Sequence, residues 1–270
     1  MAYLSGTGRV ALLSRDGGEK RVSQSRPTVS VIIPAYNEAD RIRPVLEAVA
    51  ASGLAREIIV VSDGSEDDTF AVARSVPGID VFQLPKNHGK AYALREGARR
   101  ARGDVLVFLD ADLIGLHPDH VRALADPVVN GTAQMALGIF GGGRFWTDLA
   151  QRIAPNISGQ RALTRASFLA IPDLEDCGFG VEVAITGYAK ACKMRIERVS
   201  FAGVTHPTKE EKLGLIRGEW ERLRMYAQIL AYKIRHSLRS LKKPVNCPDC
   251  SSAELGPNAP MLAKSPLDED

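Results

Sequence analysis

Short apolar runs alternate with stretches of helical apolar spacing between residues 28 and 109. The runs have the length of strands, and each is followed by polar or glycine-rich residues. Strands that alternate with helices in this way form βαβ units. The sequence therefore predicts an α/β fold with a mostly parallel central sheet and helices on both faces. We expect strands at 29–34, 57–62, 80–84 and 104–109, and helices at 40–51, 67–75 and 91–102.

Polar side chains follow each of the four predicted strands. They form the clusters Asn37 and Glu38, Asp63 to Ser65, Asn87 to Lys90, and Asp110 to Asp112. In open sheets of this kind, ligands bind beyond the carboxyl ends of the strands, at the crevice where the strand order reverses. We therefore expect the four clusters to meet at one edge of the sheet and to form a binding site there.

The acidic pair Asp110 and Asp112 comes at the end of the apolar run VLVFLD. Two carboxylates this close repel each other unless a cation lies nearby. Mg²⁺ and Mn²⁺ prefer oxygen ligands and would bridge the pair to a diphosphate. Helix capping or simple solvation is the alternative for an acidic pair, but its place after a buried strand favours a metal site.

Asp63 and Lys90 are further candidates for ligand binding. Gly64 permits an unusual backbone conformation, and Ser65 is expected to cap the next helix, which leaves the Asp63 carboxylate open to a base N–H. Lys90 precedes the predicted helix 91–102, whose N-terminus already carries partial positive charge, so a lysine there favours a bound anion. An N-cap role for Asp63 and a solvated Lys90 are the alternatives.

The four motifs in this order resemble the nucleotide-sugar-dependent glycosyltransferases of family 2, which have the GT-A fold. The resemblance lies in SVIIPAYNE (30–38), IVVSDGSEDDT (59–69), KNHGKAYALREGARRARGD (86–104) and FLDADL (108–113). It implies that Asp112 coordinates the metal ion and that Asp110 helps to hold the sugar and ribose. The other residues that it assigns to the nucleotide sugar are Pro34, Tyr36, Glu38, Asp63, Lys90 and Ala111.

Two segments of the second half resemble related GT-A families. SGQRALTR (158–165) is similar to a Gly-x-Arg/Lys stretch of polyprenyl-phosphate glycosyltransferases, which implies that Arg161 contacts the nucleotide sugar. GFGVEV (178–183) is similar to GYGVEI of glucosyl-3-phosphoglycerate synthases, whose later metal-binding histidine is matched by His206. Glu182 is then the candidate base or acceptor holder, although the glutamate-aspartate pair of many inverting members is absent. A helix-start carboxylate and a structural histidine are the alternatives.

These residues predict a glycosyltransferase that uses a nucleotide sugar and Mg²⁺ or Mn²⁺. UDP-glucose is the first expected donor and GDP-mannose the second. Two acceptors stay open, a polyprenyl phosphate and a small soluble acid such as 3-phosphoglycerate, and so does the stereochemical outcome. A sugar nucleotidyltransferase is disfavoured because PAYNEADR offers no Gly-rich loop after the first strand. A non-catalytic nucleotide-sugar-binding protein is disfavoured because Asp63, Asp110 and Asp112 are all present.

The remaining segments differ in composition from the catalytic part. We expect a flexible lead-in over residues 1–26, the GT-A domain over 27–208, a basic amphipathic helical arm over 209–243 and a disordered tail over 244–270. The apolar face of the arm, within 212–243, is expected to pack on the core or on a second copy in a homodimer, or to lie on an anionic membrane.

Charge and hydropathy limit the compartment and the partners. The formal charge of +3 over 270 residues gives no chain-wide attraction to nucleic acid. The sequence has neither a bilayer-spanning apolar run nor a secretory signal, so we expect a cytoplasmic protein, with any membrane contact at the inner face. Cys247 and Cys250 form a single CxxC pair, which has too few ligands for a structural zinc without a partner chain.

Overall fold

The computed structural model describes residues 2–5, 9–12, 26–141, 158–207 and 248. The chain divides into two units, residues 1–25 with 249–270, and residues 26–248. In the first unit, β1 (Ala2–Ser5) pairs antiparallel with β2 (Arg9–Leu12), within the predicted lead-in. The predicted arm over 209–243 lies outside the described residues, as do Cys247, Cys250 and all of the predicted tail except Pro248.

The second unit contains a seven-stranded sheet with the strand order β5-β4-β3-β6-β8-β7-β9. The pairs among β3, β4, β5 and β6 are parallel, and so is the β7–β9 pair, whereas β8 runs antiparallel to both of its neighbours. The mostly parallel sheet that the sequence predicts is thus confirmed. The strands are β3 (Val29–Ala35), β4 (Glu57–Ser62), β5 (Ile79–Gln83), β6 (Val105–Phe108), β7 (Met135–Gly141), β8 (Arg161–Thr164) and β9 (Ile196–Ala202).

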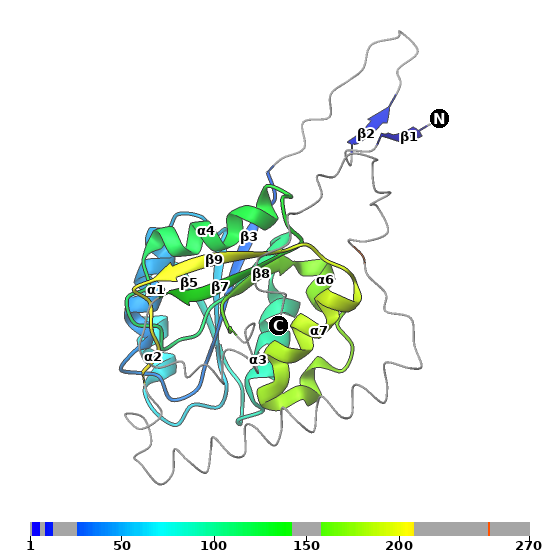
Figure 1. Ribbon diagram of the computed structural model, residues 1–270. Coiled ribbons are helices and arrows are strands. Elements are labelled where there is room, and N and C mark those ends of the chain that lie inside the picture. Colours follow the sequence, from blue (N-terminus) through cyan, green and yellow to red (C-terminus); the bar gives the residue numbers. More distant parts are fainter. Residues whose placement is uncertain (1, 6–8, 13–25, 142–157, 208–247, 249–270) are drawn as a thin grey trace, which may run out of the picture. The chain divides into compact units, whose positions relative to one another are not determined.

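Helices cover both faces of this sheet (Figure 1). One face packs against α1 (Ile42–Ala51) and α4 (Pro118–Val129), and α2 (Thr69–Arg74) lies beside β5 and α1. The other face carries α3 (Lys90–Arg100), the short α6 (Arg165–Leu169), the 3₁₀ helix η1 (Leu174–Gly180) and α7 (Val181–Ala191). The strand order reverses between β3 and β6, so the binding crevice of such a fold is expected beyond their carboxyl ends.

The central strand β3 is buried on both faces, which explains its continuous apolar run. Val31 and Ile33 belong to the core beneath α1 and α4. Ile32 points to the opposite face, where a Cβ added at Gly97 of α3 would lie 2.5 Å from its Cγ2 atom. The glycine therefore lets α3 approach β3 closely, and this approach fixes where the N-terminus of α3 lies.

A buried carboxylate joins the strands at their N-terminal edge. Glu57 accepts a hydrogen bond of 2.6 Å from the Ser30 hydroxyl and one of 3.3 Å from Nε of Arg102, and Gly103 N donates to Ser30 Oγ at 2.8 Å. Burial raises the pKa of Glu57, but the hydrogen bonds from Ser30 and Arg102 outweigh it and hold the pKa below its ordinary value. We refer to Ser30, Glu57, Arg102 and Gly103 as the Glu57 cluster.

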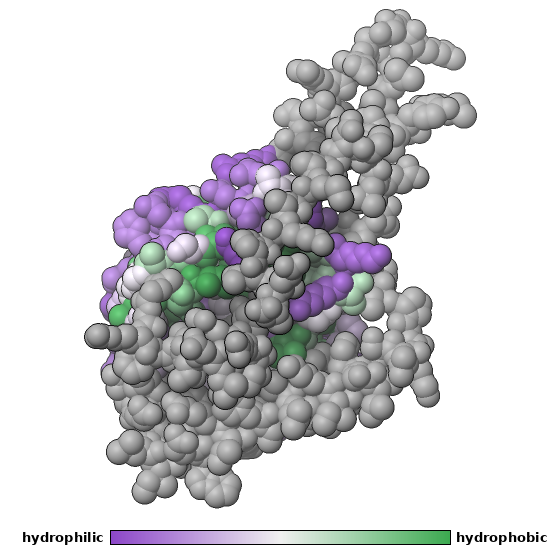
Figure 2. Space-filling model, in the orientation of Figure 1, coloured by the Kyte–Doolittle hydropathy of each residue, from purple (hydrophilic) through white to green (hydrophobic). Residues whose placement is uncertain are grey.

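Surface character differs between elements of the second unit. Hydrophilic residues dominate the described surface over α4, as Figure 2 shows. Among the described helices, none is both long enough and apolar enough to cross a bilayer.

Candidate functional site

The four polar clusters meet at the C-terminal edge of β3, β4 and β6, as expected from the parallel register. Backbone N of Asn37 donates to Ser65 Oγ at 3.2 Å, and backbone N of Glu66 donates to Asn37 Oδ1 at 2.9 Å, so the first two clusters are joined. Asp63 contacts the third cluster, and Lys90 contacts Asp110 of the fourth. The expectation that the four clusters meet at one edge of the sheet is therefore confirmed.

Lys90 lies between two carboxylates from distant parts of the chain. Its Nζ atom is 2.7 Å from Asp110 Oδ1 and 2.7 Å from Glu182 Oε1. Burial lowers the pKa of the Lys90 ammonium, but the charges and hydrogen bonds of Asp110 and Glu182 raise it above its ordinary value. Lys90 therefore stays charged and holds Asp110, at the end of β6, against Glu182, in the first turn of α7.

Asp110, Asp112 and His206 form a metal-binding arrangement. One potential ligand atom from each of the three lies within 4.8 Å of the others. His206 Nδ1 is 3.1 Å from Asp112 Oδ1, and His206 Nε2 is 3.9 Å from Asp110 Oδ2. The two carboxylates offer the oxygen ligands that Mn²⁺ and Mg²⁺ prefer, and the imidazole nitrogen is a third potential ligand. We call Asp110, Asp112, Glu182, Lys90 and His206 the acidic cluster.

The charges of this cluster act on one another. Burial raises the pKa of Asp110, but Lys90 and then His206 counteract it, so that the pKa lies below its ordinary value. Burial lowers the pKa of His206, but the hydrogen bond to Asp112 and the charges of Asp110 and Asp112 raise it above the ordinary value. Asp112 acts in the opposite direction to Lys90 and His206, because its charge repels that of Asp110, and a bound cation would relieve this repulsion.

His206 reaches the acidic pair because two loops pair through their backbones. Ile114 N donates to Thr205 O at 2.9 Å, and Thr205 N donates to Ile114 O at 3.0 Å. Gly115, with φ at +77°, allows this close approach, because a Cβ there would lie 2.6 Å from Gly203 O. The pairing brings together residues that are 94 positions apart in the sequence.

The Asp63 carboxylate accepts hydrogen bonds from backbone amides and is not free for a ligand in the way the sequence predicted. Its Oδ1 accepts from His88 N at 2.8 Å and its Oδ2 from Gly89 N at 2.7 Å, and the residue is buried. The expectation of an open carboxylate is therefore corrected. The predicted Ser65 cap is also wrong, because α2 begins only at Thr69 and Ser65 Oγ accepts from Asn37 N and Ser62 Oγ. Both predictions failed for the same reason. Asp63 and Ser65 bond to loops that are distant in the sequence, and a local pattern does not show such contacts.

The residues after β3 lie where the nucleoside was expected. Tyr36 is 42% exposed, which leaves its ring accessible for stacking. Glu38 is held by Arg41 at 3.5 Å, and its backbone N donates to Thr69 Oγ1 at 2.8 Å. Pro34 is half-buried within β3, and Ala111 is buried between Asp110 and Asp112. Contacts of Pro34, Tyr36, Glu38, Asp63 and Ala111 with a nucleotide sugar stay predictions.

Gln160 is a site residue that the sequence analysis missed. Its Nε2 atom donates to Asp110 Oδ2 at 2.9 Å, while its Oε1 accepts from the Ser158 hydroxyl at 2.8 Å. A Cβ at Gly159 would lie 2.4 Å from Asp110 Oδ2, so a larger residue there would displace the Asp110 carboxylate. The signal was the polar sequence Ser-Gly-Gln directly before the apolar β8, which the resemblance treated only as a setting for Arg161.

Arg161 is buried behind the site. It is 1% exposed, and its guanidinium donates to the carbonyl oxygens of Ser158 and Glu182. Burial lowers its pKa to about 10, although the charges of Glu182 and Asp110 counteract this. A direct contact of Arg161 with a nucleotide sugar stays a prediction, and the observed contacts are with the protein backbone.

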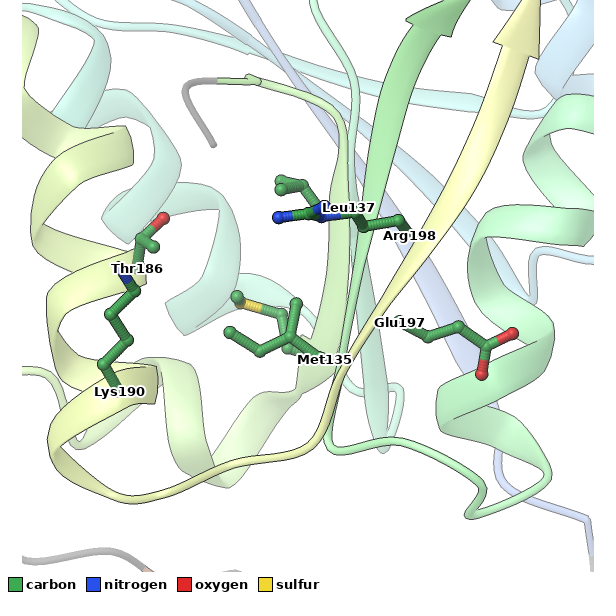
Figure 3. A pocket seen from close by; sticks show the side chains of 7 residues that line it. Met135, Leu137, Thr186, Lys190, Glu197 and Arg198 are labelled. Carbon is green, nitrogen blue, oxygen red and sulfur yellow. The ribbon is translucent and has the colours of Figure 1, made fainter. Parts of the chain in front are cut away.

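A separate cavity of about 490 Å³ lies between α7, β7 and β9. Figure 3 shows Thr186 and Lys190 of α7 on one side and Met135 and Leu137 of β7 with Arg198 of β9 on the other. Met135 and Leu137 are buried and form an apolar floor. Thr186 links this cavity to the site, because its Oγ1 donates to Glu182 O at 2.8 Å.

A mostly parallel sheet with a strand-order reversal, and a group of carboxylates beside that reversal, define an α/β protein with a candidate cation site in its crevice, as in the GT-A fold of the solved structures described below. Residues 30–186 match the model of the family described as glycosyl transferase family 2. The chain therefore belongs to this family, and the resemblance and the fold class that the sequence indicated are confirmed.

Relatives and solved structures agree with this family. Glucosyl-3-phosphoglycerate synthase of Mycolicibacterium paratuberculosis is 31% identical over 204 residues, which cover 62% of this chain and 61% of the relative. Dolichyl-phosphate beta-glucosyltransferase of Drosophila melanogaster is 38% identical over 107 residues, which cover 34% of this chain and 33% of the relative. The chain thus spans less than two thirds of the length of these relatives.

A solved structure shows the same fold with ligands. It is glucosyl-3-phosphoglycerate synthase from Mycobacterium tuberculosis in complex with Mn²⁺, uridine diphosphate and glucosyl-3-phosphoglycerate. This structure matches with a TM-score of 0.62 and 26% identity, and the match covers 76% of this chain and 78% of that one. Another structure of that enzyme, with Mn²⁺, UDP-glucose and phosphoglyceric acid, matches with a TM-score of 0.61 and 28% identity.

Proposed function

We propose that this protein transfers glucose from UDP-glucose to a small phosphorylated hydroxy acid of the 3-phosphoglycerate type. The observation that carries the proposal is the acidic cluster, in which Lys90, Asp110 and Glu182 join the end of β6 to the start of α7 beside the Asp110, Asp112 and His206 trio. The broader coverage by glucosyl-3-phosphoglycerate synthases than by dolichyl-phosphate enzymes supports the small acid as acceptor.

The reaction we propose exchanges one bond at the sugar. A hydroxyl oxygen of the acceptor forms a bond to C1 of glucose, the bond between C1 and the diphosphate oxygen breaks, and the acceptor hydroxyl loses its proton, so that UDP and a proton are released. Asp110, Asp112 and His206 would hold Mn²⁺ or Mg²⁺, which when bound neutralises the charge of the leaving diphosphate. The pairing of these ligands at 3.1 Å and 3.9 Å supports this assignment.

Residues of the site would also bind and orient the donor, and Asp110 would serve both the metal ion and the sugar. Asp63 fixes the backbone of His88 and Gly89, and so the start of α3 from which Lys90 projects. Asp110 and Glu182 would hold sugar hydroxyl groups, while Lys90 keeps both carboxylates in place and offsets part of their charge. Tyr36 would stack on the base, since its ring is partly exposed at the end of β3.

A polyprenyl phosphate is the second candidate acceptor. It is supported by the match to dolichyl-phosphate beta-glucosyltransferase and by the basic, periodic apolar sequence of residues 212–243. In that case the arm would contact an anionic membrane surface, where each Lys or Arg contributes about 1 kcal/mol. In the other case, we propose that the arm would pack on the core or on a second copy in a homodimer.

The test is a matrix of two donors and two acceptors with the full chain. UDP-glucose or GDP-mannose is mixed with 3-phosphoglycerate or a detergent-solubilised polyprenyl phosphate, with and without Mn²⁺, and the glycosylated product is detected by mass spectrometry. We expect product only from UDP-glucose, 3-phosphoglycerate and metal together. Product from the polyprenyl phosphate alone moves the function to the second candidate. Absence of product in every arm, with a folded protein, contradicts both.

A further inference from the structure

The guanidinium of Arg161 joins two segments that carry opposite sides of the site. Its Nε donates to Ser158 O at 3.2 Å, and its Nη2 also donates to this carbonyl. Its Nη1 donates to Glu182 O at 3.3 Å and to Thr186 Oγ1 at 3.4 Å. One planar group therefore links the residue before Gly159 to the first two turns of α7.

The Ser158 side of this link leads to Asp110. The Ser158 hydroxyl holds Gln160, whose amide donates to Asp110 Oδ2, and Gly159 lies close against the same carboxylate. The position of the Ser158 backbone therefore sets the position of two groups that pack on Asp110. A shift of this backbone would move the hydrogen bond from Gln160 away from Asp110.

The α7 side of the link leads to Glu182. Its carbonyl accepts from Arg161 and from the Thr186 hydroxyl, while its side chain pairs with Lys90 at 2.7 Å. Figure 3 shows Thr186 on the face of α7 that is turned toward β7, the neighbour of the strand that Arg161 begins. The anchored carbonyl fixes the rotation of the first turn and so the direction of the Glu182 carboxylate.

We propose that Arg161 is a positioning residue that fixes the separation between Asp110 and Glu182, by binding the backbone on both sides of them. The proposal rests on the proposed function, in which these two carboxylates hold the transferred sugar. Arg161 itself touches neither the sugar nor the metal in this assignment. The role differs from the contact with the nucleotide sugar that the sequence implied.

An arginine suits this role because of its geometry. Its donors are arranged in a rigid planar fork, so that carbonyl groups from two elements can be bound in one fixed orientation. Lysine offers a single nitrogen on a flexible stem and cannot reproduce the fork. Burying a charge that has no direct ion-pair partner costs stability, so a purely structural link is better made by neutral groups. An arginine that lowers stability at this position is consistent with a role in the activity of the site.

The experiment compares two arginine-to-lysine substitutions. Arg161→Lys loses the fork, whereas the control Arg165→Lys changes an arginine of α6 that donates to Ala98 O at 3.2 Å, away from the site. A misplacement of catalytic groups by about 1 Å costs on the order of 100-fold in rate. We expect Arg161→Lys to lower kcat by about 10- to 100-fold with little change in the Kd for UDP. We expect Arg165→Lys to keep the wild-type kcat, even if both variants lower the Tm.

A double-mutant cycle with Glu182→Gln separates positioning from general damage. If Arg161 acts partly through Glu182, the fold-loss from Arg161→Lys is smaller in the Glu182→Gln background than in the wild type. The proposal is overturned if Arg161→Lys lowers the Tm but keeps kcat. It is also overturned if the fold-loss of kcat in the double variant equals the product of the fold-losses in the two single variants. If Arg161→Lys does not fold, Thr186→Val takes its place, and an unchanged kcat in that variant overturns the proposal.

The outcome for the wild type keeps this inference distinct from the proposed function. A wild-type protein without acceptor-dependent transfer contradicts the proposed function. An active wild type with an unaffected Arg161→Lys variant contradicts only the role of Arg161. The Kd for UDP, measured by calorimetry, shows in either case whether the donor site is intact.

Discussion

A buried carboxylate and a group of half-buried carboxylates lie at opposite edges of the same sheet and differ in the charges around them. In the Glu57 cluster, one carboxylate receives hydrogen bonds from a hydroxyl, backbone amides and one arginine. In the acidic cluster, three carboxylates converge on one lysine and one histidine. The first arrangement is complete without a ligand, whereas in the second Asp110 and Asp112 repel each other.

This difference separates a structural carboxylate from a functional one. A carboxylate whose oxygens all accept hydrogen bonds from protein groups stabilises the fold. Replacing it leaves the buried donor groups without partners. Carboxylates that repel one another lower the stability of the folded protein, and a bound cation or ligand offsets this loss of stability. Burial alone does not distinguish the two groups, because Glu57 is at least as buried as Asp110 and Glu182. The two groups differ instead in the charges and hydrogen-bond donors that surround their carboxylates.

The largest effect is expected from Asp112→Asn. We expect it to lower the rate of transfer by about 100-fold or more, because a charged metal ligand is lost at the leaving group. The Tm without metal should not fall, since one of the repelling carboxylates is neutralised. Initial rates over a Mn²⁺ titration and thermal unfolding measure both. A variant with the wild-type rate at limiting Mn²⁺ removes Asp112 from the metal site.

The opposite outcome is expected for Glu57→Gln. We expect the free energy of unfolding to fall by about 2 kcal/mol, because charge-assisted hydrogen bonds are lost in a buried position. The rate per folded molecule should stay at the wild-type value. Urea denaturation and initial rates make the comparison, with Glu96→Gln as control, since its arginine partners Arg99 and Arg100 are about half exposed. A strong loss of activity would break the distinction between the clusters.

Asp63 sharpens the comparison, because it lies at the functional edge yet bonds to backbone like a structural carboxylate. We expect Asp63→Ala to raise the Kd for UDP by about tenfold and to lower kcat by a smaller factor. The reason is that the loop before α3 loses two hydrogen bonds. Asp68→Ala is the control, because Asp68 is an exposed carboxylate in the same loop between β4 and α2. Calorimetry with UDP and Mn²⁺ measures both variants, and an unchanged affinity for Asp63→Ala would make Asp63 purely structural.

The smallest effect is the pH dependence that Glu57 contributes to stability. Its pKa in the folded protein lies below the ordinary value of 4.5. Its contribution is therefore fully present above the pKa of the unfolded state and is lost as the pH falls through the folded-state pKa. We expect the Glu57→Gln variant to show a shallower loss of stability in this acid range. Urea denaturation at a series of acid pH values tests this, and parallel curves for both proteins would contradict it.

Much of the fold could be predicted from local sequence patterns. The alternation of strand and helix periods located β3 to β6 and α1 to α3 to within a few residues, because each buried strand of a parallel sheet is a continuous apolar run. Polar residues after those strands located one side of the site for the same reason. Asp110 and Asp112 were identified as a metal-binding pair from their place after a buried strand.

The second half resisted such reasoning because its roles depend on contacts across the chain. The sequence by itself determined the parallel sheet, the acidic pair and, through resemblance, the candidates Glu182 and His206. Only the tertiary structure decided that Lys90 joins Asp110 to Glu182, that Gln160 holds Asp110, and that Arg161 lies behind the site. Hydrogen bonds and ion pairs act over about 3 Å. Residues tens of positions apart meet at that distance only after the strands have paired, so no local pattern records their contact.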